Sequence, residues 1–328
     1  MKAAIFDKFG SAQEVLKIQN IEDPKINNNE VIVKLSKSGV NPSDVKKRAG
    51  AFSNLLDNGF VVPHSDGAGV IVDVGNEVSR DRIGERVWIY QAQYERNYGT
   101  AAELLSIDSS RAIKLPDNTS LETGACLGIP AMTAHRCIFA DGSVRGKNIL
   151  VTGGAGRVGY YAIQWGKLFG ARVISTASNN DDKQACLDIG ADGVVNHREE
   201  DWELSALEEN HGEKFDRLVD VEFGVNLDHT LNIMKTGSTI ATYSSTQNPN
   251  PKIPFLKMMY MDLTLRLVIV YAMPEEAKND AIKDINNKLS NNHLVHRVAK
   301  SYDLNDIVKG HELIESNKVR GCVILNIS

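Results

Sequence analysis

The sequence predicts an α/β protein in which a β-rich part precedes a parallel sheet covered by helices on both faces. Short strand-like runs separated by Gly, Pro, Asn and Asp fill residues 1–121. Strand and helix patterns alternate between residues 123 and 264, which is typical of a doubly wound parallel sheet. A G-x-G-x-x-G motif, residues 154–159, stands at the junction of one such strand and helix.

The β-rich part and the chain's tail contain the elements that are easiest to assign. Residues 31–35, 69–74 and 86–90 have the β-branched and aromatic content of strands. The tail has mixed character, with a helix expected at 274–289 and a closing strand at 322–327.

The alternating part predicts strands at residues 148–151, 172–176, 193–195, 217–221 and 238–243. In the glycine motif, Gly154 is expected to make the tight turn, Gly156 to let the backbone approach a pyrophosphate, and Gly159 to let the helix pack on the strand. The alternative is an ordinary glycine-rich connection between a strand and a helix. The helix and strand patterns on either side favour the phosphate-binding interpretation.

Composition excludes several classes of protein. The chain of 328 residues is long enough for two cores, and 42% hydrophobic residues with 24% charged residues is an ordinary balance. A formal net charge of −5 makes nucleic acid an unlikely partner and argues against an anionic membrane surface. Asp7 interrupts any signal-peptide core, and the longest apolar run, 263–273, is short and contains Arg266. We therefore expect a cytoplasmic protein without a membrane segment.

The cysteines and histidines indicate neither a disulfide framework nor a metal site. The four cysteines lie far apart and form no C-x-x-C pair: Cys126, Cys137, Cys186 and Cys322. His293 and His296 form the one close histidine pair, and no acidic or cysteine partner lies near them in the sequence.

Several motifs in a fixed order identify a family resemblance that covers essentially the whole chain. They occupy residues 38–44, 65–71, 74–75 with 84–87, 127–134, the glycine loop, and 190–198. With these motifs the chain resembles the medium-chain dehydrogenase/reductase superfamily, and within it the zinc-free quinone oxidoreductases similar to zeta-crystallin. The resemblance implies a GroES-like β-rich catalytic domain, residues 1–122 and 265–328, and a Rossmann NADPH-binding domain, residues 123–264.

The resemblance also shows which residues are replaced. Zinc-dependent relatives have a Cys where this chain has Asn41 and a His-Glu pair where it has Ser65 and Asp66. They also have four closely spaced cysteines near the segment 90–99, which holds none here. A catalytic zinc needs about three N, S or O ligands from the protein. We therefore expect no bound metal and no alcohol oxidation that relies on a Lewis acid.

The end of the second strand of the alternating part bears on the choice of cofactor. NADH-binding proteins usually have an acidic residue there that binds the ribose, and this chain has Ala177 and Ser178 instead. Lys183, five residues after Ser178, is suited to pair with the 2′-phosphate of NADPH. Asp181 and Asp182 either cap the helix that contains Lys183 or weaken NADPH binding. The sequence favours NADPH as the cofactor.

The resemblance implies further contacts with the cofactor. Asn196 and His197 would border the adenine, although His197 is as well explained as a surface residue. The backbone amides of Ala155, Gly156, Arg157 and Val158 would bind the phosphates. Other implied contacts near the nicotinamide, its ribose or the pyrophosphate are Asn41, Thr133, Phe223, Tyr243, Ser244 and, with Lys318 as the alternative, Arg320.

The acceptor site is expected around Asn41. By resemblance its amide points toward the nicotinamide ribose and the substrate oxygen, while the alternative is that Asn41 and Pro42 only begin a turn. Asp44 either orients Asn41, lines the cleft or caps the helix, and Phe52 is a candidate wall for the acceptor. The basic run 46–48 is expected to be solvated, with attraction of an anionic substrate as the alternative.

These residues predict an NADPH-dependent quinone oxidoreductase with zinc-independent hydride transfer. The first alternative is an NADPH-dependent reductase of alkenal or enone double bonds, and the second is a crystallin-like or RNA-binding protein that keeps NADPH with little turnover. In relatives the segment corresponding to 265–271 pairs across a two-fold axis. Such an apolar run is hazardous as a free edge strand, so we expect a homodimer.

Overall fold

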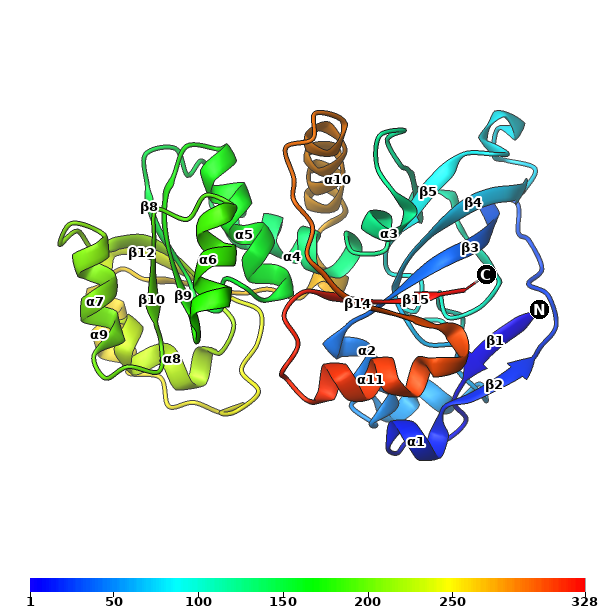
Figure 1. Ribbon diagram of the computed structural model, residues 1–328, viewed down its shortest axis with the longest axis horizontal. Helices are drawn as coiled ribbons and strands as arrows, with labels where there is room; N and C mark the ends of the chain where they lie inside the picture. The colour runs from blue at the N-terminus through cyan, green and yellow to red at the C-terminus, as the bar shows by residue number, and fades with distance from the viewer. Residues whose placement is uncertain (328) are drawn as a thin grey trace. The chain divides into compact units, whose positions relative to one another are not determined.

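The computed structural model describes residues 1–327. Contacts between residues divide the chain into two compact units: unit 1, Met1–Ile129 with Ile282–Ser328, and unit 2, Pro130–Ala281. In Figure 1 the blue N-terminal and red C-terminal segments both belong to unit 1. The domain limits given from the sequence, 122/123 and 264/265, remain predictions.

Unit 1 contains a seven-stranded sheet in which strands from both ends of the chain pair. Its order is β14-β15-β3-β4-β5-β7, and β6 also pairs with β3. The C-terminal strand β15 runs antiparallel to β3, with Leu325 opposite Ser38. The strands of the unit are β1 (Lys2–Ile5), β2 (Lys17–Asn20), β3 (Glu30–Val40), β4 (Asp66–Val74), β5 (Arg86–Ile89), β6 (Leu104–Asp108), β7 (Ala112–Lys114), β14 (Val298–Asp303) and β15 (Cys322–Asn326).

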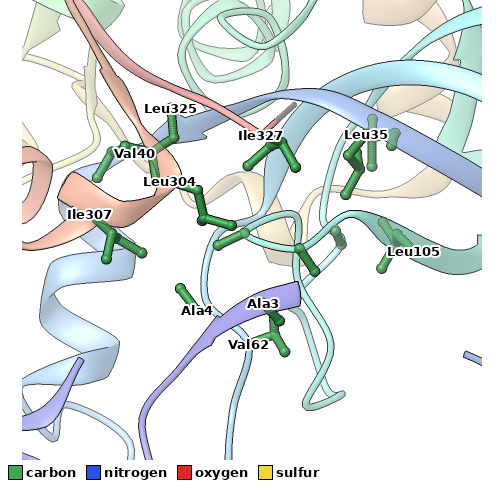
Figure 2. Packing of buried hydrophobic residues seen from close by; sticks show 14 of the residues in the cluster. Ala3, Ala4, Leu35, Val40, Val62, Leu105, Leu304, Ile307, Leu325 and Ile327 are labelled. Atoms are coloured by element: carbon green, nitrogen blue, oxygen red, sulfur yellow. The ribbon is translucent and has the colours of Figure 1, made fainter. Parts of the chain in front are cut away.

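The core of unit 1 joins the two chain ends directly. Figure 2 shows Ala3 of β1 and Leu35 of β3 in the same cluster as Leu325 and Ile327 from the C-terminus. Leu304 packs there from the η5 turn (Leu304–Asp306), which leads into α11 (Ile307–Glu315). Burial of each Leu or Ile side chain is worth about 1.5–3 kcal/mol, so the tail is an integral part of this unit.

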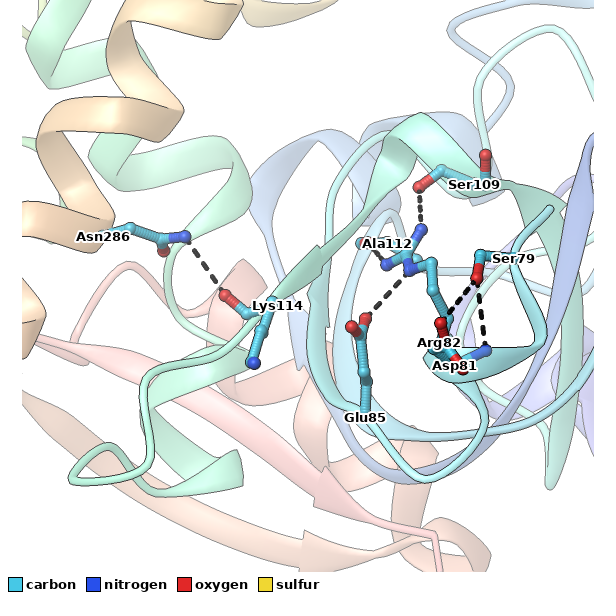
Figure 3. A network of polar contacts seen from close by, with 8 residues as sticks. All are labelled: Ser79, Asp81, Arg82, Glu85, Ser109, Ala112, Lys114 and Asn286. Carbon is cyan, nitrogen blue, oxygen red and sulfur yellow. Dashed lines mark hydrogen bonds and ion pairs between the residues drawn. The ribbon is translucent and has the colours of Figure 1, made fainter.

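A polar network holds the edge of the same sheet. Arg82 donates to the Glu85 carboxylate at 2.9 Å, to the Ser109 carbonyl at 2.9 Å and to the Ala112 carbonyl at 2.6 Å. Its guanidinium therefore ties the turn after β4 to the start of β7 (Figure 3). The other contacts drawn there join Ser79 to Asp81 and Asn286 to Lys114.

Unit 2 is a six-stranded parallel sheet with the order β10-β9-β8-β11-β12-β13. The chain leaves β8 in one direction for β9 and β10 and returns to its other side at β11. Ligands of such sheets bind at the carboxyl ends of the strands where this reversal occurs. The strands are β8 (Asn148–Val151), β9 (Arg172–Ala177), β10 (Gly193–Asn196), β11 (Phe215–Asp220), β12 (Met234–Thr242) and β13 (Thr264–Leu267).

Helices cover both faces of this sheet. Leu150, Leu218 and Ile240 pack in one cluster with side chains of α7, α8 and α9. On the opposite face α5 lies so close that a Cβ on Gly166 would be 2.7 Å from Val173. Figure 1 shows α5 and α6 alongside the strands. The helices of the chain are α1 (Ala12–Val15), α2 (Pro42–Arg48), α3 (Leu121–Gly124), α4 (Gly128–Phe139), α5 (Arg157–Leu168), α6 (Asn180–Asp188), α7 (Trp202–Glu209), α8 (Phe223–Thr230), α9 (Phe255–Tyr260), α10 (Glu275–Ser290) and α11.

The fold class predicted from the sequence is confirmed, because a β-rich unit accompanies a parallel sheet with helices on both faces. The predicted strand 238–243 begins earlier, at Met234, and the predicted helix 274–289 is α10. Within residues 1–327, no helix combines the length and the apolar character needed to span a bilayer.

Candidate functional site

The glycine loop connects β8 to α5 and is packed against β9. Gly154 lies in the tight turn as predicted, because Gly156 N donates to the Gly153 carbonyl at 2.9 Å across it, and Gly153 before it has a φ of +63°. A Cβ on Gly154 would lie 2.0 Å from the Ser175 hydroxyl, so this position needs glycine for close approach. A Cβ on Gly159 would lie 2.5 Å from the Gly153 carbonyl, which agrees with the predicted packing role of Gly159. Gly156 is the N-cap of α5, so the positive end of this helix faces the loop.

Asp220 fixes the loop from the neighbouring strand, at the point where the strand order reverses. Its Oδ1 accepts hydrogen bonds from the Thr152 hydroxyl at 2.6 Å and from Asn226 Nδ2 at 2.8 Å. Burial raises the pKa of Asp220, and its Oδ2 has no hydrogen-bond partner within residues 1–327. The sequence analysis missed this residue, although an acid at the end of an apolar strand was a usable signal.

The carboxyl ends of β11 and β12 bring three predicted cofactor residues together. Phe223 N donates to the Ser244 carbonyl at 3.0 Å, and Tyr243 N donates to the Asp220 carbonyl at 3.3 Å. Phe223 is buried at the start of α8. Thr133, predicted to reach the cofactor, is buried in α4.

A cavity of about 780 Å³ extends along β10, from Arg172 and Asp192 to Ala177 and Asn196. Two residues predicted to bind the adenosine end of the cofactor, Lys183 and Asn196, are among those that line it. Ser178 and His197, the other residues predicted there, are not among its lining residues, and the binding of the adenosine end remains a prediction.

The acids beside Lys183 act as a helix cap. Asp182 N donates to Asn179 Oδ1 at 2.8 Å, and Asn179 Nδ2 donates to Asp182 Oδ2 at 2.8 Å. This is the first of the two alternatives for Asp181 and Asp182, and Asp181 is exposed in the first turn. Lys183 is exposed as well, so its ammonium is accessible to an anion.

Asn196 is already engaged in the turn that follows β10. Its Nδ2 donates to Glu199 Oε1 at 3.0 Å, and its Oδ1 accepts from Arg198 N at 3.1 Å. The neighbouring His197 is exposed. These hydrogen bonds hold the Asn196 side chain within the turn. The predicted contact of Asn196 and His197 with the adenine remains a prediction.

In unit 1, Asn41 is the N-cap of α2 and forms a capping box with Asp44. Asn41 N donates to Asp44 Oδ2 at 2.8 Å, and Pro42 occupies the first helical position. Asn41 therefore begins a helix, and the predicted contact of its amide with the nicotinamide ribose and the substrate remains a prediction. Asn41 Nδ2 donates to Asp66 Oδ2 at 2.9 Å, and the same oxygen accepts from Ile129 N at 2.8 Å.

The basic run 46–48 is not a solvated face, which corrects the sequence interpretation. Lys46 is exposed, but Lys47 and Arg48 are 6% and 0% exposed. Positions 44, 47 and 48 share one face of α2, the face that is turned into the unit. Lys47 Nζ lies 3.4 Å from the Ser65 hydroxyl and also donates to the Gln93 carbonyl. Arg48 pairs with Glu315.

Three buried titratable groups gather around Asn41. Burial raises the pKa of Asp66 to about 8 and that of Asp44 to about 6, while the positive charge of Lys47 opposes both shifts. Burial lowers the pKa of Lys47 to about 8, and the two carboxylates oppose this shift. Groups that titrate near neutrality in one buried cluster are typical of functional sites.

Two further predicted residues lie outside these contacts. Phe52 is 50% exposed and begins the turn η1 (Ser53–Leu56). Arg320 donates through Nη1 to the Asn317 carbonyl at 2.8 Å and to the Val319 carbonyl at 3.2 Å. Their roles in acceptor and cofactor binding remain predictions.

Comparison with known proteins places both parts of the chain in one group. The family model "Alcohol dehydrogenase GroES-like domain" matches residues 27–117, and "Zinc-binding dehydrogenase" matches residues 158–287. The chain is 29% identical to the quinone oxidoreductase of Pongo abelii, over 99% of this chain and 97% of that protein. It is 31% identical to the quinone oxidoreductase of Mus musculus, over 73% of this chain and 72% of that protein.

Two other similarities bear on substrate and cofactor. The chain is 32% identical to a 2-methylene-furan-3-one reductase of Solanum lycopersicum, over 62% of this chain and 54% of that protein. A mycobacterial protein solved in complex with NADPH superposes with a TM-score of 0.88, at 25% identity and over 100% of both chains.

Zinc, which one family description names, does not fit the residues of this chain. Among residues 1–327, no three His, Cys, Asp or Glu side chains are gathered as metal ligands, and the four cysteines are buried thiols that form no disulfide in this range. Where zinc-dependent relatives place ligands, this chain has an amide, a hydroxyl and one carboxylate, and the ammonium of Lys47 lies beside them. This donor set lacks the N and S ligands of a catalytic zinc.

Proposed function

The chain belongs to the quinone oxidoreductase family of the medium-chain dehydrogenases/reductases, and we propose that it reduces quinones with NADPH without a metal ion. The observation that carries the proposal is the glycine loop at the strand reversal of unit 2, which precedes the N-terminus of α5. A separate cavity that Lys183 lines adds to it. Such a loop places a pyrophosphate at a helix N-terminus. Bound NADPH supplies the hydride.

The adenosine end of NADPH is assigned to the cavity. Lys183 offers an exposed ammonium for the 2′-phosphate, and the cap between Asp182 and Asn179 keeps the Asp182 carboxylate engaged elsewhere. Ser178 and Asn196 complete this end. The amides of Gly156 and Val158 serve the pyrophosphate, with Thr133, Phe223, Tyr243, Ser244 and Arg320 as further proposed contacts.

Asn41 is assigned to the acceptor. Asp66 holds one N–H of its amide, so the second N–H remains for an acceptor oxygen that gains negative charge during reduction. Asp44 holds the backbone of Asn41 and is proposed to orient it. Phe52 is proposed as an apolar wall of the acceptor site.

A second candidate function is reduction of an enone double bond. The relative from Solanum lycopersicum named as a 2-methylene-furan-3-one reductase favours it. An enone and a quinone both place negative charge on a carbonyl oxygen after hydride arrives, so the Asn41 amide suits either. A protein that binds NADPH with little turnover is the remaining alternative.

The deciding experiment follows loss of NADPH absorbance with phenanthrenequinone, benzoquinone and a short alkenal, and with NADH in parallel. We expect quinone turnover with NADPH that Asn41→Ala abolishes and that Asn58→Ala, a change at an exposed asparagine of unit 1, leaves intact. Turnover of the alkenal alone would establish the enone reductase. Tight NADPH binding without turnover of any acceptor would establish the binding protein.

We also propose a homodimer, formed through β13, and a cytoplasmic location. β13 is the edge strand of the unit 2 sheet, and the side chains of Leu267 and Ile269 are 74% and 55% exposed. An apolar edge of this kind is suited to pair with a second copy. Sedimentation equilibrium tests the dimer, and Leu267→Lys is expected to yield monomers.

A further inference from the structure

The ammonium of Lys47 is buried on the inner face of α2, beside the residues that hold Asn41. Resting on the proposed function, we propose that Lys47 is a positioning residue: its positive charge favours the ionised form of Asp44 and Asp66 and thereby favours one orientation of the Asn41 amide. The chain thus has a covalently attached cation beside the positions where zinc-dependent relatives hold a metal.

The geometry places Lys47 between the elements that carry the acceptor site. It follows Asp44 by three residues on α2, so both side chains lie on the buried face of the helix. Its Nζ lies 3.4 Å from the Ser65 hydroxyl, and Ser65 directly precedes Asp66 at the start of β4. Lys47 also donates to the Gln93 carbonyl. The long side chain is therefore held at its tip.

Both carboxylates that attract Lys47 hold Asn41. Asp44 accepts from the Asn41 backbone at 2.8 Å, and Asp66 accepts from the Asn41 side chain at 2.9 Å. An ionised carboxylate only accepts hydrogen bonds, so Asn41 must turn its NH₂ group toward Asp66. A protonated Asp66 has an O–H that can donate to the amide oxygen, so either orientation of the Asn41 amide then becomes possible.

The site around Asp66 is closely packed, and this makes a counter-charge necessary. A Cβ on Gly128 would lie 2.1 Å from Asp66 Oδ1, and this oxygen has no hydrogen-bond partner among the residues that the structure describes. A buried carboxylate without compensation is protonated instead of charged. Burial raises the pKa of Asp66 to about 8, and the hydrogen bonds from Ile129 N and Asn41 together with the positive charge of Lys47 oppose this rise.

The other titratable group that faces Lys47 does not provide a charge. His64, which directly precedes Ser65, is buried and contacts the ring of His311 at 2.9 Å between the two Nε2 atoms. Burial and the charge of Lys47 lower the pKa of His64 to about 3, so it is neutral at physiological pH. Of His64 and Lys47, Lys47 is therefore the group that supplies positive charge beside Asp44 and Asp66.

The test compares Lys47→Met, which keeps the chain length and removes the charge, with Lys46→Met, which removes the exposed charge next to it. NADPH oxidation with phenanthrenequinone is measured from pH 6 to pH 9, and NADPH affinity is measured by fluorescence. Since Lys47 lowers the pKa of both carboxylates, its loss raises them. In Lys47→Met we expect the pH range over which kcat rises to shift to higher pH by about one unit or more, with unchanged NADPH affinity. In Lys46→Met we expect the pH profile of kcat to stay unchanged.

A double variant separates positioning from general damage. Asp66→Asn keeps an acceptor oxygen for the Asn41 amide and removes the charge that Lys47 balances. We expect Lys47→Met/Asp66→Asn to recover much of the kcat lost in Lys47→Met and to lack its shifted limb. An unshifted profile in Lys47→Met, or a double variant no better than the single one, would overturn the proposal. If Lys47→Met does not fold, the charge-balanced double variant takes its place, compared with Asp66→Asn alone.

A readout without turnover separates this proposal from the proposed function. The ¹⁵N side-chain signals of Asn41 are followed by NMR during a pH titration, with assignment by Asn41→Ala. We expect them to titrate with Asp66 in the native protein and at higher pH in Lys47→Met. Titrating signals in a protein that reduces no acceptor would contradict the proposed function alone. Signals that do not respond to pH would contradict the role of Lys47.

Discussion

Two charge clusters, one in each unit, differ in burial and in the balance between carboxylates and cations: in unit 2 Arg217 is buried while Asp141 and Arg266 are partly exposed. In unit 2 one carboxylate, that of Asp141, meets two guanidinium groups: Arg217 at 2.8 Å and Arg266 through Nε at 2.9 Å. In unit 1 two carboxylates, Asp44 and Asp66, share the single ammonium of Lys47. The pKa of Asp141 falls to about 2, whereas that of Asp66 rises to about 8.

The difference shows how one chain uses buried charge for two purposes. Arg217 donates to the Cys137 carbonyl at 2.6 Å as well as to Asp141, so the unit 2 cluster joins α4 to β11 and β13 with its hydrogen bonds made. The unit 1 cluster leaves Asp44 Oδ1 and Asp66 Oδ1 without partners within residues 1–327. The first arrangement stabilises the fold, and the second responds to pH where a reaction is proposed.

The largest effect is expected from breaking the unit 2 cluster. Arg217→Met removes one cation and two hydrogen bonds from a buried site, and loss of a buried ion-pair partner costs about 3–5 kcal/mol. Urea unfolding measures the change. Lys235→Met, which removes an exposed partner of Asp216, is the control and should cost about 0–1 kcal/mol. Equal effects of the two changes would show that the buried cluster does not stabilise unit 2.

A smaller effect is expected from crowding the unit 1 cluster. Gly128→Ala puts a methyl group against Asp66 Oδ1, and overpacking of this kind costs about 1–3 kcal/mol. Because Asp66 holds Asn41, turnover should fall as well. Gly310→Ala in α11 is the control, since its Cβ would meet its nearest neighbour at 3.4 Å. Full activity and stability in Gly128→Ala would show that Asp66 can move freely.

The pH dependence of stability should have opposite signs in the two clusters. The lowered pKa of Asp141 stabilises the fold above the unfolded value of 3.8, and this contribution is lost as the pH falls toward 2. The raised pKa of Asp66 means that the folded chain keeps a proton which the unfolded chain releases, so stability declines as the pH rises from about 4 to 8.

Urea unfolding of Asp66→Asn and Asp141→Asn at pH 5 and pH 8 measures this contrast. Asp66→Asn should gain stability relative to the native protein between the two pH values. Asp141→Asn should be destabilised to a similar degree at both, because both lie above the titration range of Asp141. The same pH response in both variants would mean that Asp66 and Asp141 affect the pH dependence of stability in the same way.

The smallest effect is expected at an exposed charge. Lys183→Met removes the proposed partner of the 2′-phosphate and should weaken NADPH binding about tenfold, equivalent to about 1.4 kcal/mol, with little change for NADH. Fluorescence titration with both cofactors measures it, and Lys214→Met, at another exposed lysine of unit 2, is the control. Equal losses for NADPH and NADH would exclude a phosphate contact.

The sequence predicted unit 2 better than unit 1 for a physical reason. The glycine loop and the strand–helix alternation are local signals, since a tight turn, a close approach and a helix start each need particular residues within a few positions. The tight turn at Gly154 was predicted, whereas the left-handed conformation of Gly153 before it was not. The two flanking glycines of the motif, Gly154 and Gly159, are held where side chains do not fit.

The acceptor site of unit 1 depends on contacts between distant segments. Asn41 was identified through a family resemblance, but its hydrogen-bond partner Asp66 lies 25 positions away in the sequence. Gly128, which packs against the Asp66 carboxylate, is still further along the chain. Lys47 and Arg48 read as part of a charged run because the sequence does not say which face of α2 packs inward. A search for helical spacing, with Asp44 three positions before Lys47, was the signal that could have revealed them.

The proposed role of Asn41 is measured by the rate of NADPH oxidation with phenanthrenequinone in the native protein and in Asn41→Ala. We expect turnover with NADPH in the native protein and a loss of at least about a hundredfold in kcat in the variant, as for other groups that stabilise a developing oxyanion. Equal rates in the two proteins would show that the Asn41 group of unit 1 does not serve the acceptor.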